Sequence, residues 1–286
     1  MTLLFLGFLG GLLHIAGSQV SAFERSAALD ISAKLRGNDR IVVVRADVGP
    51  EAIWGDVSSV KISASQFVTN GLPLYTESKR SHRGLVRMLH LDLQDFILRN
   101  LHIQRLKAEI SDCRFDFPLA VNRRQIRLSQ SGIGVGEVVI SEQDLEKFIL
   151  SKFREIKRVT VRIDKDKVFV DGYGEFLIVS TNFSVVARLE SVGGDKLVMA
   201  HCRILFDGRP ADDASQKVLL DTLNPVVDLN TDLGLFGAIK VEQIELRNGV
   251  LKASGPIFIP ELPQEKTSLN SANVGTKQRS KALLQQ

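Results

Sequence analysis

The chain has 286 residues, of which 44% are hydrophobic and 24% are charged, and its formal net charge is +4 at pH 7. This composition is typical of globular proteins and excludes disorder for the bulk of the chain. The charge is too small for the dense basic surface of a nucleic-acid-binding protein, so we expect no nucleic-acid partner, although attraction to an anionic membrane surface is compatible with it.

The first 22 residues have the pattern of a signal peptide that lacks a basic n-region. Met1 to Ile15 contain no charged side chain, and this run is shorter than the about 20 residues of a membrane-spanning helix. Ala22 and the residue two positions before it fit an A-x-A-like cleavage site. We predict cleavage near Ala22 and a periplasmic or other extracytoplasmic location. The alternatives are a buried N-terminal helix or a membrane anchor through residues 3–16.

The next elements are a helix and a series of strands. Apolar residues recur every four positions up to a glycine at residue 37, which predicts a short helix with Phe23, Ala27, Ile31 and Leu35 on its buried face. Runs rich in β-branched residues predict strands over residues 40–48, 57–68, 136–140, 159–163, 167–171, 175–189, 196–206, 239–247 and 250–254, with more extended chain between 89 and 117. Turns at 164–166, 193–194 and Asn248-Gly249 separate several of them and predict consecutive hairpins, hence an antiparallel sheet.

Two further helices interrupt this sheet. Ser141 and Asp144 resemble a capping box, and the apolar face that follows contains Leu145, Phe148, Ile149, Phe153 and Ile156. The opposite face carries Lys147, Lys152, Arg154 and Lys157, which predicts a solvated basic face or, alternatively, a membrane-docking surface. The second helix runs from Asp213 to near Leu223, with Val218, Leu219 and Leu223 inward, and stops before Pro225.

The sequence contains no catalytic or metal-binding motif that we recognise. The five histidines are widely separated, and neither H-E-x-x-H nor G-x-S-x-G occurs. The glycine-rich run at residues 132–136 leads into a strand rather than a helix, so it predicts a strand entry rather than a phosphate site. Cys113 and Cys202 lie on apolar strand faces, and either a disulfide or two buried free thiols would fit. We therefore expect no enzyme activity, no metal and no cofactor.

Several stretches of the chain follow one another in a characteristic order. The first are Val42–Val48, WGDVSSVKISA from Trp54 and VTNGLPL from Val68. VVISEQDL from Val138 and the closing hairpin IKVEQIELRNGVLKASG from Ile239 follow. In this order they resemble the LmeA-like phospholipid-binding family. The resemblance covers about residues 23–259, and the basic stretch at residues 79–83 is outside the pattern.

The resemblance implies an α+β fold, a lipid-binding roll in which a curved antiparallel β-sheet wraps around a few helices and leaves an apolar cavity. The apolar face of a curved sheet must be shielded from water by other apolar groups. Acyl chains of a lipid could shield part of it, and each methylene group that they bury there contributes about 0.8 kcal/mol. Our candidate lipid-binding residues are Leu145, Phe148, Ile149, Phe153, Phe176, Ile178, Phe183, Val185 and Ile204, each of which could equally be ordinary core. Our candidate docking residues are Lys147, Arg154 and Lys157.

The expected organisation is therefore a signal peptide over residues 1–22, a lipid-binding domain over 23–259 and a disordered tail over 260–286. The tail is rich in Pro, Gln, Lys, Ser and Asn and has little to bury. The function that this predicts is extracytoplasmic binding of phospholipid or another acyl lipid, with transfer between envelope membranes or presentation as its use. The alternative is a structural envelope scaffold with no ligand.

Overall fold

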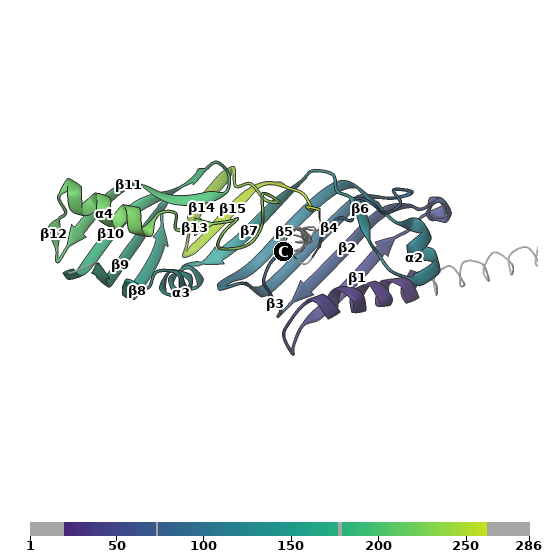
Figure 1. The fold of residues 1–286 in the computed structure, drawn as a ribbon, viewed down its shortest axis with the longest axis horizontal. Helices are drawn as coiled ribbons and strands as arrows, with labels where there is room; N and C mark the ends of the chain where they lie inside the picture. Colours follow the sequence, from purple (N-terminus) through teal and green to yellow (C-terminus); the bar gives the residue numbers. More distant parts are fainter. Residues whose placement is uncertain (1–19, 73, 177–178, 262–286) are drawn as a thin grey trace, which may run out of the picture.

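Two curved sheets lie end to end along the long axis of the protein (Figure 1). The computed structural model describes residues 20–72, 74–176 and 179–261. Residues 1–19, which carry most of the predicted signal peptide, and residues 262–286, which carry most of the predicted tail, lie outside the described residues. Pro260 and Glu261 belong to the fold, because the Thr76 amide donates a 2.8 Å hydrogen bond to the Pro260 carbonyl and Thr76 and Glu261 form a β-bridge.

The larger sheet, sheet A, is shown on the right in Figure 1. Its strands are β1 (Ile41–Asp47), β2 (Asp56–Ser65), β3 (Val68–Thr69), β4 (Gly84–Leu98), β5 (Leu101–Phe115), β6 (Leu128–Gln130), β7 (Gly134–Ser141), β14 (Gln243–Arg247) and β15 (Val250–Ile257). Their main order is β1-β2-β4-β5-β7-β15-β14, with β3 beside β4 and β6 beside β5. Short helices flank this sheet: the helix over residues 20–34, η1 (Pro50–Trp54) and α2 (Phe117–Arg123).

The smaller sheet, sheet B, continues the protein beyond β14, which lies against β8 and β10. Its strands are β8 (Ile156–Asp164), β9 (Lys167–Phe176), β10 (Val179–Val192), β11 (Lys196–Phe206), β12 (Arg209–Pro210) and β13 (Val227–Asp228). Two helices, α3 (Glu142–Lys152) and α4 (Asp213–Leu223), cover its inner face. The α+β class and the curved sheet that the sequence predicts are thus confirmed.

The long hairpin of β4 and β5 lies in the middle of sheet A. Its two strands alternate buried and exposed side chains along most of their 15 residues each, which gives the sheet one apolar face. Both β2 and β3 run parallel to β4, whereas the other strand pairs are antiparallel. The predicted antiparallel pairing holds for the other strand pairs but not for these two, because the chain over residues 66–83 returns to the starting end of the sheet before β4 begins.

The glycine-rich run enters β7, as predicted. A Cβ atom on Gly134 would lie 2.0 Å from the carbonyl oxygen of Glu109, and one on Gly132 would lie 2.0 Å from that of Ser111. Such approaches leave room only for hydrogen at these two positions. The glycines therefore allow β7 to pair closely with β5 and so join sheet A to β15 and β14.

The helix α3 confirms its predicted start and corrects its predicted end. The Ser141 hydroxyl accepts a 3.1 Å hydrogen bond from the Asp144 amide, as the capping box requires. The helix ends at Lys152, so Phe153 is its C-cap and Ile156 already belongs to β8, although both stay buried. Lys152 is not on a solvated face: its Nζ lies 2.6 Å from Asp232 and 2.7 Å from the Pro225 carbonyl.

The helix α4 matches its predicted bounds and is capped by Asp212, which accepts a 2.9 Å hydrogen bond from the Ser215 amide. Leu219 and Leu223 are buried, but Val218 is 49% exposed, so its inward placement was wrong. Residues four apart share one helix face, and the residue before such a pair is turned about 100° away from it. That rotation leaves Val218 beside the buried stripe.

The two cysteines belong to different sheets and are free thiols. Cys113 in β5 is fully buried, whereas Cys202 in β11 is half-buried. Burial raises the pKa of both thiols above the ordinary value. The structure therefore favours the free-thiol alternative that the sequence left open.

His102 connects the turn end of the β4–β5 hairpin to α3. Its Nε2 lies 2.7 Å from Asp95, and its Nδ1 lies 2.9 Å from Asp144. Burial opposes the charged form, but hydrogen bonds with Asp144 and Asp95 outweigh burial and raise the pKa of His102. A raised pKa in the folded state means that the charged histidine stabilises the fold fully below about pH 6.5 and less as the pH rises through the raised value.

We predict that His102→Gln lowers the free energy of unfolding by about 1–2 kcal/mol at acidic pH and by less at alkaline pH. Urea unfolding of the variant and the wild type at about pH 5.5 and pH 8.5 measures the difference. The control is His90→Gln, because His90 forms only an exposed 3.5 Å ion pair with Glu109 on the same hairpin. An equal loss at both pH values would contradict the charged bridge.

Candidate functional site

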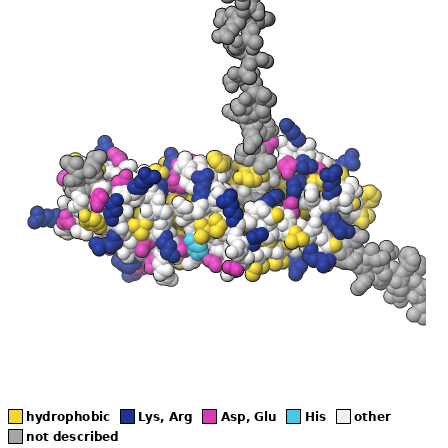
Figure 2. All heavy atoms as spheres, turned by 60° about the horizontal axis from the view of Figure 1, so that its bottom comes forward, with side chains coloured by type: hydrophobic (Ala, Val, Ile, Leu, Met, Phe, Trp, Pro, Cys, Tyr) yellow, Lys and Arg dark blue, Asp and Glu magenta, His cyan; other side chains and the backbone are white. Residues whose placement is uncertain are grey.

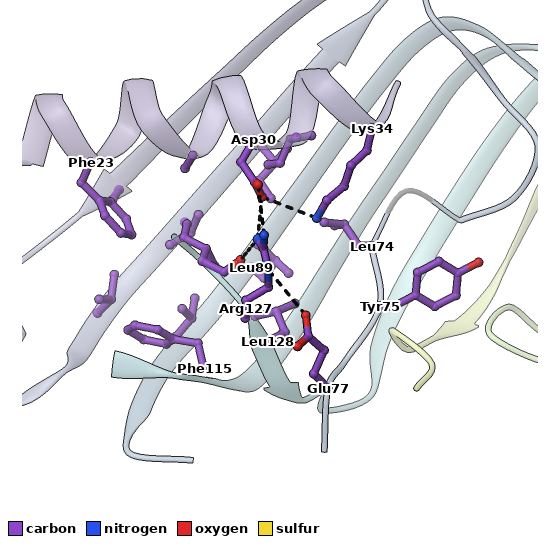
Figure 3. Close-up of a pocket in the computed structure, with 18 of the residues that line it drawn as sticks. Phe23, Asp30, Lys34, Leu74, Tyr75, Glu77, Leu89, Phe115, Arg127 and Leu128 are labelled. Carbon is purple, nitrogen blue, oxygen red and sulfur yellow. Dashed lines mark hydrogen bonds and ion pairs between the residues drawn. The ribbon is translucent and has the colours of Figure 1, made fainter. Parts of the chain in front are cut away.

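A large, mainly apolar cavity lies between the helix over residues 20–34 and sheet A (Figure 3). Its volume is about 520 Å³, within the range of about 300–1,000 Å³ typical of small-molecule sites. The wall on the helix side contains Phe23, Ala27, Asp30, Ile31 and Lys34. The wall on the sheet side contains Ala46, Val48, Val57, Val60, Ile62, Thr69, Val86, Leu89, Phe115, Ile126, Arg127 and Leu128, and the loop after β3 adds Leu72, Leu74, Tyr75 and Glu77.

The apolar stripe of the N-terminal helix forms one wall because it does not pack fully against the sheet. Ala27, Ile31 and Leu35 are buried, as the spacing of four predicts, and Phe23 is partly buried. Ala27 and Ile31 line the cavity, so the same stripe serves both the core and the cavity wall. Packing of this kind leaves a mainly apolar space along the helix stripe.

One side of the cavity carries a cluster of charged side chains. Arg127 binds Asp30 with both ends of its guanidinium, at 2.6 and 3.1 Å, and so joins the chain entering β6 to the N-terminal helix. This hydrogen bond holds the pKa of Asp30 below its ordinary value against the opposing effect of burial. Two-point contacts of this type fix the orientation of both partners.

Three more charged residues extend the cluster. Lys34 lies 3.5 Å from Asp30, and Glu77 lies 3.5 Å from Arg127, as the dashed lines in Figure 3 mark. Arg80 binds the other side of Glu77 at 2.5 Å. Three cations and two carboxylates leave one positive charge in excess, and Lys34 is the most exposed of the four residues that line the cavity, at 46%.

A polar groove of about 620 Å³ adjoins this cluster and shares Glu77 with the apolar cavity. The groove is lined by Thr76, Glu77, Ser78, Lys79, Arg80, Ser81, Asp116 and Glu261. An apolar cavity beside a polar groove is the arrangement that an amphipathic ligand requires, with its tail in the cavity and its polar head in the groove.

Smaller apolar spaces continue the cavity along the inner face of sheet A. One of about 50 Å³ shares Ile31, Ile62, Leu72 and Leu74 with the large cavity. Another, of about 80 Å³, shares Phe67, Leu93 and Ile257 with the first of these. Together they form an interrupted apolar path beneath the N-terminal helix and the loop over residues 229–241.

The structure places the lipid-binding candidates from the sequence at the other end of the protein. Leu145, Ile149, Phe153 and Phe183 line a space of only about 20 Å³ between sheet B and its two helices. Phe148, Val185 and Ile204 are buried and line none of the five cavities and grooves described for this fold. Ile178 and the side chain of Phe176 lie outside the described residues. Their role in lipid binding remains a prediction.

The docking candidates do not form one helix face. Lys147 is exposed on α3, whereas Arg154 follows the helix and Lys157 is the second residue of β8. Lys157 lies 3.4 Å from Glu175 and donates a hydrogen bond to the Arg154 carbonyl. Their contact with a membrane also remains a prediction.

The residues that sequence analysis missed are those of the charged cluster. Asp30 and Lys34 are four residues apart on the predicted helix, which is a recognisable ion-pair spacing. The basic stretch at residues 79–83 was visible as a charge run, and the structure brings it to the groove beside the cavity. No local pattern marks Arg127, because its partner Asp30 is 97 residues away.

Within the described ranges, no group of three or more His, Cys, Asp or Glu residues could hold a metal ion. Among the helices of the same ranges, none is long and apolar enough to cross a membrane.

Comparison with known proteins gives one match. No curated protein and no solved structure matches this chain. The family model described as LmeA-like phospholipid-binding matches residues 20–255, which include the N-terminal helix and both sheets. Because the match covers most of the sequence, this chain belongs to the LmeA-like phospholipid-binding family.

Proposed function

We propose that the protein holds a phospholipid with its acyl chains in the cavity beneath the N-terminal helix and its headgroup beside Lys34, Arg127 and the adjoining groove. The observation that carries this proposal is the direct contact between an apolar cavity of about 520 Å³ and a charged cluster with one cation in excess. Family membership supports lipid as the ligand class.

The energetics favour this site over the space in sheet B. Each acyl methylene that leaves water contributes about 0.8 kcal/mol, so affinity grows with the volume available to the chain. A space of about 20 Å³ between α3, α4 and sheet B admits no methylene chain without displacing core side chains. The cavity in sheet A receives a chain without such displacement.

The charged cluster supports an anionic headgroup. Arg127 is held by Asp30 in a partly buried position, and Lys34 keeps its ammonium partly exposed at the cavity. A phosphate near these two cations would gain charge-assisted hydrogen bonds. The same cluster offers no activated nucleophile, and the family is defined by phospholipid binding rather than by a reaction.

We also propose that the protein acts outside the cytoplasm and carries or presents lipid there. The support is the uncharged run from Met1 to Ile15 followed by a possible cleavage site near Ala22. The second candidate function, a ligand-free envelope scaffold, is favoured by one observation: sheet B is filled almost completely by its own side chains. Lipid uptake by sheet A distinguishes the two.

We predict that Ala46→Phe lowers lipid binding about tenfold, because excluding even two methylene groups costs about 1.6 kcal/mol. Ala46 lines the cavity from β1, and the free space lets a larger side chain fit without overpacking. Native mass spectrometry of the purified protein and displacement of a fluorescent fatty acid measure the bound lipid. The control is Phe148→Trp, which overpacks α3 and costs about 1–3 kcal/mol of stability without changing lipid content. Reduced lipid in the control and unchanged lipid in Ala46→Phe would move the site to sheet B.

We predict that Lys34→Gln weakens binding of an anionic phospholipid about fivefold and binding of a zwitterionic one less, because both lose a charge-assisted contact to the phosphate but the choline cation of the second already offsets part of the phosphate charge. Titration with short-chain phosphatidylglycerol and phosphatidylcholine measures both. Lys61→Gln is the matched control, since it removes the same charge from an exposed position on β2 that does not line the cavity. Equal effects of the two variants would assign the result to net charge alone.

We predict that residues 1–22 direct a fused periplasmic reporter out of the cytoplasm, with cleavage near Ala22. Cell fractionation and N-terminal sequencing of the fusion measure export and processing. An exported but uncleaved fusion would support the anchor through residues 3–16, and retention in the cytoplasm would overturn the localisation.

A further inference from the structure

One end of the protein exposes large apolar side chains in a turn. The helix η1 between β1 and β2 presents Ile53, which is 72% exposed, and Trp54, which is 78% exposed. Neither side chain packs into the core, and Trp54 is the only tryptophan in the chain. Tryptophan has an apolar ring with one polar N–H group, a combination that is enriched where proteins meet the surface of a membrane.

The helix α2 lies beside this turn and adds to the same surface. A Cβ atom on Gly55 would lie 2.8 Å from the Phe117 ring, so the end of η1 touches the start of α2. Val121, on α2, is 61% exposed. Figure 1 places η1, α2 and the start of the N-terminal helix at the same end of the protein, and Figure 2 shows hydrophobic and basic side chains gathered there.

Three arginines lie around the apolar centre of this surface, and Glu51 of η1 is an acidic neighbour. Arg123 and Arg124 end α2, and Arg83 precedes the first residue of β4, which pairs with Phe115 just before α2. All three arginines are exposed, and none forms an ion pair with another described residue. We call Ile53, Trp54, Val121 and these three arginines the docking tip.

The large cavity ends directly behind the docking tip. Val48 and Val57 flank η1 in the sequence and line the cavity. Phe115 and Ile126 flank α2 and line it as well. The two segments that carry the exposed apolar residues are therefore the segments that close this end of the cavity.

The chain also enters the fold at this end. The helix over residues 20–34 begins beside α2 (Figure 1), and the sequence before residue 20 contains the uncharged run of residues 1–15. If residues 3–16 anchor the chain instead of being cleaved off, that anchor would hold the docking tip toward the bilayer. The apolar centre, the unpaired arginines and the point of chain entry favour the same occupant, an anionic phospholipid bilayer.

We propose that the docking tip inserts Ile53 and Trp54 into the interface of an anionic bilayer and brings the closed end of the cavity to the lipid surface. The membrane contact stands on the exposure and charge of the tip, whereas its use in lipid loading rests on the proposed function. This surface is distinct from the one suggested by Lys147, Arg154 and Lys157.

The fluorescence of Trp54 tests the contact directly, because no other tryptophan contributes to the signal. Vesicles of phosphatidylcholine mixed with phosphatidylglycerol should shift the emission to shorter wavelength, and phospholipids brominated on their acyl chains should quench it. Ile53→Asp, which keeps the reporter, should weaken vesicle binding about tenfold. Arg123→Gln combined with Arg124→Gln should weaken it about fivefold per arginine and reduce its salt dependence.

Two controls separate this surface from others. Phe236→Asp changes a residue that is 65% exposed in the loop near Arg99, at the opposite end of the β4–β5 hairpin, and should leave vesicle binding unchanged. Lys147→Gln combined with Arg154→Gln and Lys157→Gln should have less effect than the change at Arg123 and Arg124. Vesicle binding without a change in Trp54 emission, or binding lost through the triple variant alone, would overturn the docking tip. A Trp54 shift in a protein that holds no lipid would support the tip and contradict the proposed function.

Discussion

The pairing of Asp30 with Arg127 helps to hold the N-terminal helix over sheet A, together with the hydrogen bond that Glu24 accepts from the Ala46 amide, and the cavity lies between that helix and the sheet. The contact joins residues 97 positions apart through two hydrogen bonds, and both side chains are largely shielded from solvent. The apolar stripe of the helix could otherwise approach β2 and β4 until the space between them closed. A partly buried ion pair is a weak source of stability but a strong constraint on geometry. Here it keeps one end of the helix at the edge of the sheet while the stripe lines the cavity.

The two halves of the protein use the same architecture with different degrees of filling. In sheet B, α3 and α4 lie over the inner face and their leucine and phenylalanine side chains fill it. In sheet A, one helix and the loop over residues 229–241 cover a larger surface and leave most of the open apolar volume. The open apolar volume is therefore concentrated in sheet A, which is where lipid uptake tests the lipid-binding interpretation against the scaffold interpretation.

Sequence analysis predicted the features that depend on neighbouring residues. The Asn248-Gly249 turn, the Ser141 cap and the spacing of Ala27, Ile31 and Leu35 are local, and the structure confirms them. The end of α3 was missed because Phe153 and Ile156 continue an apolar spacing that is equally compatible with a helix and with the start of a strand. The parallel pairing of β2 with β4 could not be deduced from turns, because the Asn70-Gly71 step in the connecting chain is typical of an antiparallel hairpin, whereas β3 and β4 are parallel.

The location of the cavity could not be predicted from the sequence, for a different physical reason. A cavity is a place where side chains fail to meet, and its wall residues are chemically the same as core residues. Val60 and Leu89 line the large cavity, whereas Val185 and Ile204 lie in a filled core, and nothing in their local sequence separates the two cases. Asp30, Glu77 and Arg127 could be placed at one site only once the strands were paired.

Gly132 and Gly134, at the entry to β7, limit which mutations this chain tolerates. At Gly134 any side chain would meet the Glu109 carbonyl, so the change of one codon would break the joint through which sheet A continues to β15, β14 and sheet B. The hydrogen bonds of β7 to both neighbours hold the halves of the protein in register. Inactivating alleles should therefore arise at Gly132 and Gly134, which line none of the cavities described above, and a genetic screen would find them as readily as alleles in the cavity wall.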